Sequence, residues 1–168
     1  MAKKVSSRVS KIKMGLISSI KSKLEEIRDG YLLCIDPSIG SGSSMPGYAI
    51  FYGMEFAESG TIYVTPSWPA HIRLQAIAEC IRTEFETPDV AAVEALPVRA
   101  IGRGRSRRGH ASLLQAAGAI ASALPTPNLI YVDPRIWHSE VGDDYVKGDA
   151  EDAEAIGDTI IRLARTLL

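Results

Sequence analysis

The sequence predicts one α/β domain, in which helices pack on a mixed five-stranded sheet, preceded by a helical extension. Five short apolar stretches have the length of strands. Three of them come before the first long helical segment of the domain, and the last two alternate with helical segments. Strands joined by short turns pair antiparallel, whereas strands joined through helices pair in parallel. With 168 residues, 46% of them hydrophobic, the chain is long enough to bury a core.

Residues 1–30 predict a basic amphipathic helix that precedes the main domain, residues 31–168. Between residues 5 and 27, hydrophobic side chains recur at every third or fourth position, and Asp29–Gly30 is typical of a helix end. This segment carries eight Lys and Arg residues against three acids. The helix either packs on the edge of the domain or on a partner subunit, or it lies along a phosphate backbone.

In the main domain, we expect the first three strands to be antiparallel neighbours, because the chain between them is short. The predicted strands are 31–36, 47–52, 61–65, 90–94 and 129–132, and the predicted helices are 70–85, 111–124 and 150–167. Residues 135–148 are expected to form a polar loop. Trp137, within that loop, is expected to pack in the core rather than to stack on a base.

Acidic residues end two of the predicted strands and open the last helix. Asp36 follows the first strand and Glu94 the fourth, at carboxyl ends where α/β proteins often place functional groups. Asp149 and Asp152 are three residues apart at a helix start, so they share one face. Carboxylates from separate elements suit Mg²⁺ or Mn²⁺. Alternatively, the two helical acids only stabilise the helix dipole, with Asp149 as the N-cap.

The net charge of −1 predicts no general attraction to nucleic acid, but the positive charges are unevenly distributed. Between residues 99 and 108, arginines alternate with small residues and no acid is present. Arginine side chains bind phosphate groups through pairs of hydrogen bonds, and glycines let the backbone approach the phosphates closely. The alternative is a solvated flexible loop. The candidate DNA-binding residues are Arg99, Arg103, Arg105, Arg107, Arg108, His110 and Lys147.

Other kinds of site are poorly supported. The three histidines lack the spacing of a zinc site, and Gly40–Ser41–Gly42 lacks the lysine of a phosphate-binding loop. Cys34 and Cys80 are interpreted as small buried side chains rather than a disulfide or a metal pair. No apolar stretch is long enough to span a membrane, and we therefore expect a cytoplasmic location, in a bacterial or phage-infected cell.

Five motifs together resemble the RuvC-like Holliday junction resolvases, which are crossover junction endodeoxyribonucleases of the ribonuclease H-like superfamily. The motifs, in the family's order, are Ile35-Asp36-Pro37-Ser38 followed by Gly47-Tyr48-Ala49-Ile50, Val93-Glu94, Leu114-Gln115-Ala116-Ala117-Gly118, Pro134-Arg135-Ile136-Trp137 and Asp149-Ala150-Glu151-Asp152-Ala153. The resemblance covers roughly residues 31–168. It implies a ribonuclease H-like fold.

The resemblance also implies a catalytic site and a partner. Asp36, Glu94, Asp149 and Asp152 would be both catalytic and metal-binding, holding two Mg²⁺ ions, for which Mn²⁺ would substitute. The substrate would be a four-way DNA junction, cut by a homodimer whose interface and DNA cleft include residues 112–124. Remaining alternatives are a nuclease of the same fold that acts on flaps, forks or RNA, and a non-catalytic DNA-binding or assembly module.

The sequence departs from the family pattern at several places, which suits a phage-encoded form. Ser38 replaces a glycine, and the turn between Asp36 and Gly47 is longer than usual. The segment between Trp137 and Asp149 is shorter, and His138 stands where the family often has Lys or Arg. The helix of residues 1–30 has no counterpart in the family core.

Overall fold

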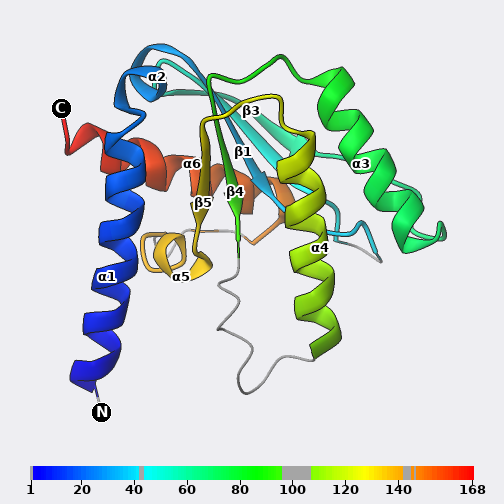
Figure 1. Cartoon of the computed structure of the whole chain (residues 1–168), viewed down its shortest axis with the longest axis horizontal. Coiled ribbons are helices and arrows are strands. Elements are labelled where there is room, and N and C mark those ends of the chain that lie inside the picture. The colour runs from blue at the N-terminus through cyan, green and yellow to red at the C-terminus, as the bar shows by residue number, and fades with distance from the viewer. Residues whose placement is uncertain (1, 42–43, 96–106, 142–144, 146) are drawn as a thin grey trace.

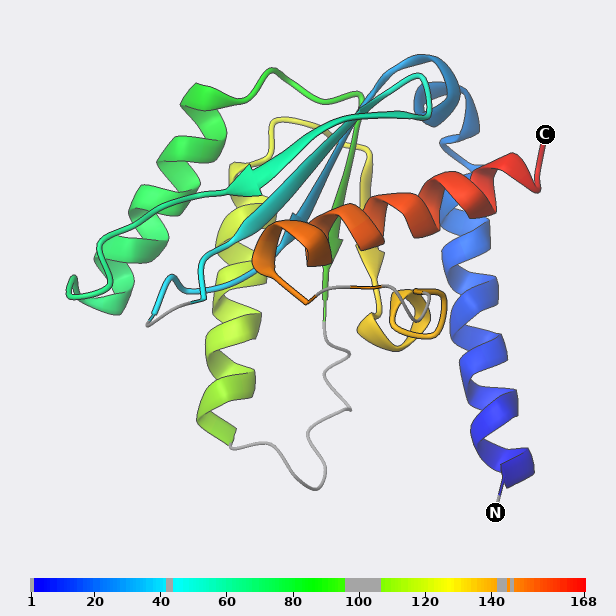
Figure 2. The same cartoon turned by 180° about the vertical axis from the view of Figure 1, so that it is seen from behind.

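The structure is a computed structural model that describes residues 2–41, 44–95, 107–141, 145 and 147–168, with side chains left out of the description for residues 2–9 and 107–110. It contains a mixed five-stranded sheet with helices on both faces (Figures 1 and 2). The strands are β1 (Tyr31–Asp36), β2 (Gly47–Tyr52), β3 (Glu55–Thr61), β4 (Val90–Glu94) and β5 (Leu129–Val132). The helices are α1 (Ala2–Lys21), α2 (Leu24–Asp29), α3 (Ala70–Glu84), α4 (Arg107–Ala123), α5 (Pro134–Trp137) and α6 (Asp149–Arg165).

The strands lie in the order β3-β2-β1-β4-β5. β1, β2 and β3 pair antiparallel, whereas β4 pairs in parallel with β1 and with β5. The predicted fold class is therefore confirmed, including the three antiparallel strands at the start. The parallel pairs place the carboxyl ends of β1, β4 and β5 at one edge of the sheet.

The third strand is not where the sequence predicted it. A two-residue turn, Gly53–Met54, joins β2 to β3, so that Tyr52 pairs directly with Glu55 and the strand ends at Thr61. Both turn residues have positive φ angles, 55° and 69°, as a tight hairpin turn requires. The prediction of 61–65 was wrong because β3 is an edge strand whose side chains are mostly exposed, so it lacks the apolar alternation of a half-buried strand.

Two hydrophobic cores lie on the two faces of the sheet. On one face, alternate residues of β1, β2 and β4 pack under α6, together with α1, α2 and α5. On the other face, the intervening residues pack under α3 and α4. In Figure 2, α6 crosses the strands in front of the sheet, while α3 and α4 lie behind it. Leu32 and Cys34 belong to the α6 face, whereas Leu33 and Ile35 belong to the α3 face.

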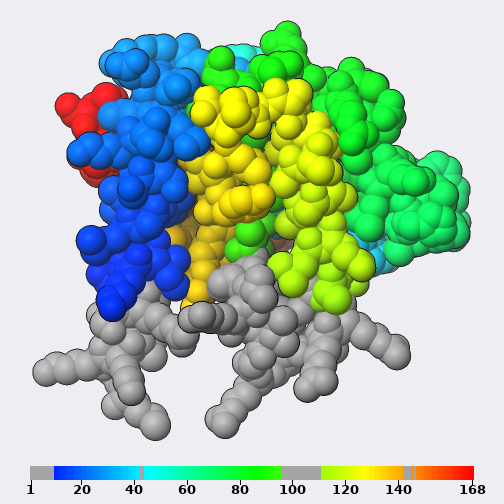
Figure 3. Space-filling model, viewed as in Figure 1, coloured from blue at the N-terminus to red at the C-terminus, as the bar shows by residue number. Residues whose placement is uncertain are grey.

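The N-terminal helix is two helices, because α1 ends at Lys21 and α2 begins at Leu24, where one continuous helix was predicted. Leu16, Ile20 and Ile27 are buried in the core under α6. Figure 3 shows α1 in blue at the left of this face of the molecule, with α4 and then α3 towards the right. The interpretation that this helix packs on the edge of the domain therefore agrees with the structure. Among the described residues, no helix is long and apolar enough to cross a membrane.

Candidate functional site

The register of the sheet places Asp36 and Glu94 on the same face. Cys34 pairs with Ala92 across β1 and β4, and both residues lie in the core under α6. Side chains alternate along a strand, so the residues two positions further on, Asp36 and Glu94, also face α6. Asp36 is mostly buried at the carboxyl end of β1.

The first residue of α6, Asp149, packs against Gly47, which is the residue of β2 that pairs with Asp36. Gly47 pairs with Asp36, and a Cβ atom on Gly47 would lie only 1.5 Å from the backbone oxygen of Asp149. Only a residue without a side chain permits this approach. Further along α6, Gly157 gives the same freedom, since a Cβ there would lie 2.1 Å from the Phe51 ring. The two glycines therefore set the helix close to the sheet and bring its first turn to Asp36.

Asp36 has an unusual electrostatic environment. Burial, followed by repulsion from Glu94, Asp152 and Asp149, raises the pKa of its carboxyl group to about 8, and Lys147 partly opposes the rise. The three other acids predicted from the sequence thus all act on Asp36. Carboxyl groups this close together repel one another when all are ionised, so such a cluster binds either protons or a cation.

One oxygen atom of Asp152 has no partner among the residues that the structure describes. This atom, Oδ1, is buried and accepts no hydrogen bond from any of them. Burial raises the pKa of Asp152, while the charge of His138 and a backbone hydrogen bond with Gly148 lower it. A buried carboxylate oxygen without a partner is costly, and a bound cation would remove that cost.

Asp149 is held by the loop between β1 and β2. The backbone N–H of Met45 donates a hydrogen bond to Asp149 Oδ2 at 2.8 Å, and the Ser44 hydroxyl donates to Oδ1 at 3.3 Å. The Ser44 hydroxyl also lies 3.2 Å from the hydroxyl of Ser38, which donates to the backbone carbonyl of Ser44 at 3.1 Å. The loop between β1 and β2 therefore orients one of the candidate metal ligands.

Glu94 is held by Trp137. The indole N–H of Trp137 donates a hydrogen bond to Glu94 Oε2 at 2.6 Å, and the Trp137 ring stacks on the His138 ring with centroids 3.8 Å apart. The prediction that Trp137 is a core residue is confirmed, because it is 1% exposed. Its contact with Glu94 could not be predicted, since 43 positions separate the two residues.

The sequence contained a signal for the helix that carries Trp137, but the prediction of a polar loop over 135–148 missed it. Asp133 accepts a hydrogen bond from the backbone N–H of Arg135 at 2.9 Å and so caps α5, which begins at Pro134. An N-cap aspartate followed by proline is a known start of a helix. Recognising α5 would have placed Trp137 and His138 beside the strand ends.

The carboxylate groups of the four acids are ligands that suit a hard cation, but in this structure the acids are not arranged around a common point. Among the described residues, no group of three or more His, Cys, Asp or Glu side chains is arranged to hold a metal ion. The donors are nevertheless all carboxylate oxygens, as Mg²⁺ and Mn²⁺ prefer, and Asp152 Oδ1 is unsatisfied. An ionised carboxylate oxygen can accept from more than one group, so the hydrogen bonds to Asp149 and Glu94 do not exclude a metal ion.

Few of the predicted DNA-binding side chains can be placed. Arg99, Arg103 and Arg105 lie outside the described residues. For Arg107, Arg108 and His110 the structure describes only the backbone, in the first turn of α4. Lys147 is exposed, and its charge reaches Asp36.

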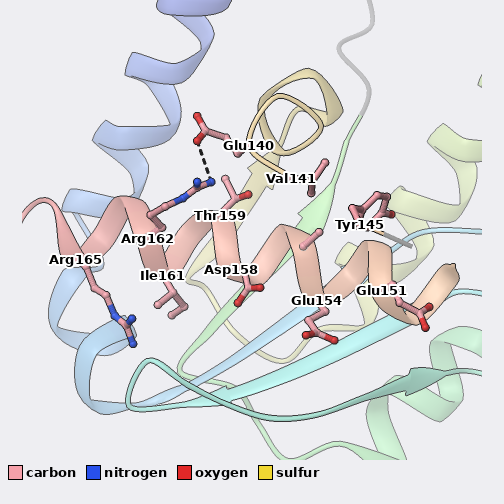
Figure 4. Close-up of a pocket in the computed structure, with 11 residues that line it drawn as sticks. Glu140, Val141, Tyr145, Glu151, Glu154, Asp158, Thr159, Ile161, Arg162 and Arg165 are labelled. Atoms are coloured by element: carbon pink, nitrogen blue, oxygen red, sulfur yellow. Dashed lines mark ion pairs between the residues drawn. The ribbon is translucent and has the colours of Figure 1, made fainter. Parts of the chain in front are cut away.

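A cavity of about 680 Å³ lies along α6, beside the site rather than at it. Figure 4 shows Glu151, Glu154 and Asp158 along one side of the helix, and the ion pair of Glu140 with Arg162, 2.9 Å, on the other. Burial raises the pKa of both Glu154 and Asp158. None of the four predicted acids lines this cavity, so we do not assign the candidate site to it.

Comparisons with known proteins support the fold. No protein-family model matches the chain, and no curated protein gives a significant match. The solved structure of Thermus thermophilus RuvC in complex with a Holliday junction substrate superposes with a TM-score of 0.62 at 18% sequence identity, covering 81% of this chain and 95% of that chain. Another T. thermophilus RuvC structure gives a TM-score of 0.54 at 17% identity, covering 81% and 96%.

At these identities the likeness concerns the fold alone. The chain has a RuvC-like ribonuclease H fold, as the resemblance of its motifs implied. The comparisons give no support to a phage origin.

Proposed function

We propose that this chain is a Mg²⁺-dependent, structure-selective DNA endonuclease that resolves four-way junctions. The observation that carries the proposal is the buried carboxyl group of Asp36, on which Glu94, Asp149 and Asp152 all act electrostatically at the strand ends of a RuvC-like sheet. A related fold was solved in complex with a Holliday junction substrate, which supports branched DNA as the substrate class.

In this proposal, Asp36 and the three other acids hold two Mg²⁺ ions, which when bound activate a water molecule and stabilise the leaving oxygen of a phosphodiester. Trp137 fixes one oxygen of Glu94, and the loop at Ser44 and Met45 fixes Asp149, so the carboxylates keep their positions before DNA arrives. Two symmetric cuts require two such sites, and we therefore propose a homodimer.

Arginines of the segment 99–108, with His110 and Lys147, are proposed to contact DNA phosphates. Their contacts do not depend on base sequence, so binding should weaken steeply as salt is raised. In this division of roles, phosphate contacts position the junction and the acids carry out the reaction.

The decisive experiment compares wild type with Asp36→Asn on a synthetic four-way junction in Mg²⁺. We expect the variant to lose cleavage by at least ~10³-fold, because charge at the metal centre is lost, while junction binding stays within a few-fold of wild type. Asp29→Asn is the matched control, since Asp29 is exposed and pairs with Arg28. Normal turnover by Asp36→Asn would refute the proposal.

A non-catalytic DNA-binding module is a second candidate, favoured by the two hydrogen bonds that engage both oxygens of Asp149. The two candidates differ in metal binding. If the chain is a nuclease, calorimetry with Mn²⁺ should detect ions bound to wild type and much weaker binding to Asp36→Asn. Tight junction binding together with no Mn²⁺ binding would favour the module.

The same acids would serve a nuclease acting on flaps, forks or RNA, because they recognise a phosphodiester rather than the shape of its substrate. A panel of these substrates at equal concentration decides between them. Junction resolution predicts paired cuts of the four-way junction at a rate at least ~tenfold above that for the other substrates.

A further inference from the structure

A groove of about 390 Å³ lies on the sheet face opposite the four acids. Tyr31, Tyr48 and Ile50, which line it, belong to the core on the α3 side, whereas Asp36 faces α6. α3 ends at Glu84, and the groove lies between the end of this helix and the antiparallel strands β2 and β3. None of the four candidate acids lines this groove.

The walls of the groove are aromatic. The Tyr48 and Phe85 rings meet edge to face with centroids 4.9 Å apart, and the Tyr31 and Tyr52 rings stack at 5.1 Å. The Tyr48 side chain packs over Gly60, where a Cβ atom would lie 2.8 Å from the Tyr48 hydroxyl and 2.9 Å from its ring. The groove is thus lined by aromatic rings from β1, from β2 and from the residue that follows α3.

Two of the aromatic rings are open to solvent. Tyr52 is 50% exposed and Tyr63 is 74% exposed, and both line the groove. Exposed hydrophobic side chains that lie together on a protein surface often mark a binding site. The groove therefore has the character of a binding surface.

The charges around the groove have one sign. Glu58 is the cross-strand partner of Ile50, and Glu84 and Glu86 flank Phe85. Among the described residues that line the groove, none is Lys, Arg or His. Burial raises the pKa of Tyr31 and of Tyr48, and the charge of Glu58 adds to both shifts. The groove therefore favours a cation and repels phosphate.

We propose that this groove binds an arginine or lysine side chain carried by an extended segment of a partner protein. A cation placed over tyrosine faces is attracted by their quadrupoles, and the three glutamates add a direct charge interaction. β3, which contributes Glu58, is the edge strand of the sheet, so the backbone of such a segment can run beside it. DNA is excluded as the occupant by the acidic rim.

The test uses the full-length protein and two peptides, acetyl-Gly-Arg-Gly-amide and its citrulline counterpart, which has nearly the same shape without the charge. We expect the arginine peptide to shift the ring NMR signals of Tyr48 and Tyr63 saturably. The citrulline peptide should bind at least about fivefold more weakly, because the cation–π and charge interactions are lost. Deoxyadenosine monophosphate serves as a nucleotide probe and should not shift these signals.

Two variants, changed at three positions in all, localise the binding. The double variant Glu58→Gln/Glu86→Gln and the single variant Tyr63→Ala should each weaken the arginine peptide by at least about threefold. All three positions are exposed, so the fold should tolerate the changes. Glu79→Gln is the matched control, because Glu79 is exposed on α3 and does not line the groove.

Equal binding of the two peptides, absence of any shift, or stronger binding of the nucleotide would each overturn the proposal. So would an unchanged affinity in the double variant. None of these outcomes depends on whether the acids on the other face cleave DNA.

Discussion

At the scale of single residues, Asp36 links the stability of the metal-free protein to pH. Its carboxyl group has a pKa of about 8 in the folded chain, against 3.8 for an ordinary aspartate. Between these values the folded chain holds a proton that the unfolded chain has released, so the free energy of unfolding falls as pH rises. The fall should be on the order of a few kcal/mol.

Urea unfolding in EDTA, at about pH 5.5 and about pH 8.5, measures this linkage. Asp36→Asn should lose less stability than wild type over this interval, because the amide does not titrate. Mg²⁺ should raise the stability of wild type at the higher pH and have little effect on the variant. Parallel pH dependences of the two proteins would contradict the assigned pKa.

Trp137 is expected to position Glu94 as well as to fill the core. Trp137→Phe keeps an aromatic ring but removes the indole N–H group, which donates the hydrogen bond of 2.6 Å to Glu94. Loss of such an outer hydrogen bond typically weakens metal affinity about tenfold or more. Calorimetry with Mn²⁺ measures the change, and Trp68→Phe, at a partly exposed position, is the control. A variant that loses stability yet binds Mn²⁺ normally would restrict Trp137 to packing.

At the scale of elements, Gly47 controls the contact between β2 and the first turn of α6. In Gly47→Ala the new Cβ would overlap the backbone of Asp149, so the helix start has to move away from Asp36. We expect a loss of at least ~1–3 kcal/mol in stability and a larger loss of cleavage, because the acids separate. Gly15→Ala is the control, since a Cβ there meets no atom within 4 Å. Chemical unfolding and junction cleavage are the measurements.

The elements also show what could be predicted from the sequence. β1, β2, β4 and β5 were predicted at their observed bounds, because apolar strands of this kind end at clear polar or turn residues. β3 was misplaced because Ile62 and Val64 are buried although they lie outside the strand. Their alternation is a burial signal, and it does not require strand pairing.

The acids were predictable and the groups that hold them were not. Asp36 and Glu94 end strands, which is visible in the sequence, whereas the hydrogen bond from Met45 to Asp149 spans 104 positions and uses a backbone N–H. Any residue except proline supplies that donor, so its residue type carries no signal. Contacts of this kind require the folded chain.

At the scale of the whole molecule, the proposed dimer is expected to use α4. Its exposed positions include Gln115, Gly118 and Ser122, and a Cβ on Gly118 would meet no atom of the described residues within 4 Å. Gly118→Arg should therefore block a close approach of two helices without harming the fold, since glycine disfavours helix by about 1 kcal/mol.

Analytical ultracentrifugation tests the expectation. The arginine variant should sediment as a monomer at concentrations at which wild type is a dimer, and it should lose paired cuts before it loses single nicks. Gly15→Arg, at an equally open position on α1, should remain dimeric. A dimeric Gly118→Arg protein would place the interface elsewhere.

The position of α6 has a consequence for the time at which activity can appear during synthesis. Asp36 leaves the ribosome early, but Asp149 and Asp152 belong to the helix that covers the same face of the sheet, and Ile156 and Ile160 of that helix complete the core. A nascent chain without α6 would expose that core and hold only half of the acids. The four candidate acids therefore come together only in the folded core, and on the proposed function a chain without α6 would not cleave DNA.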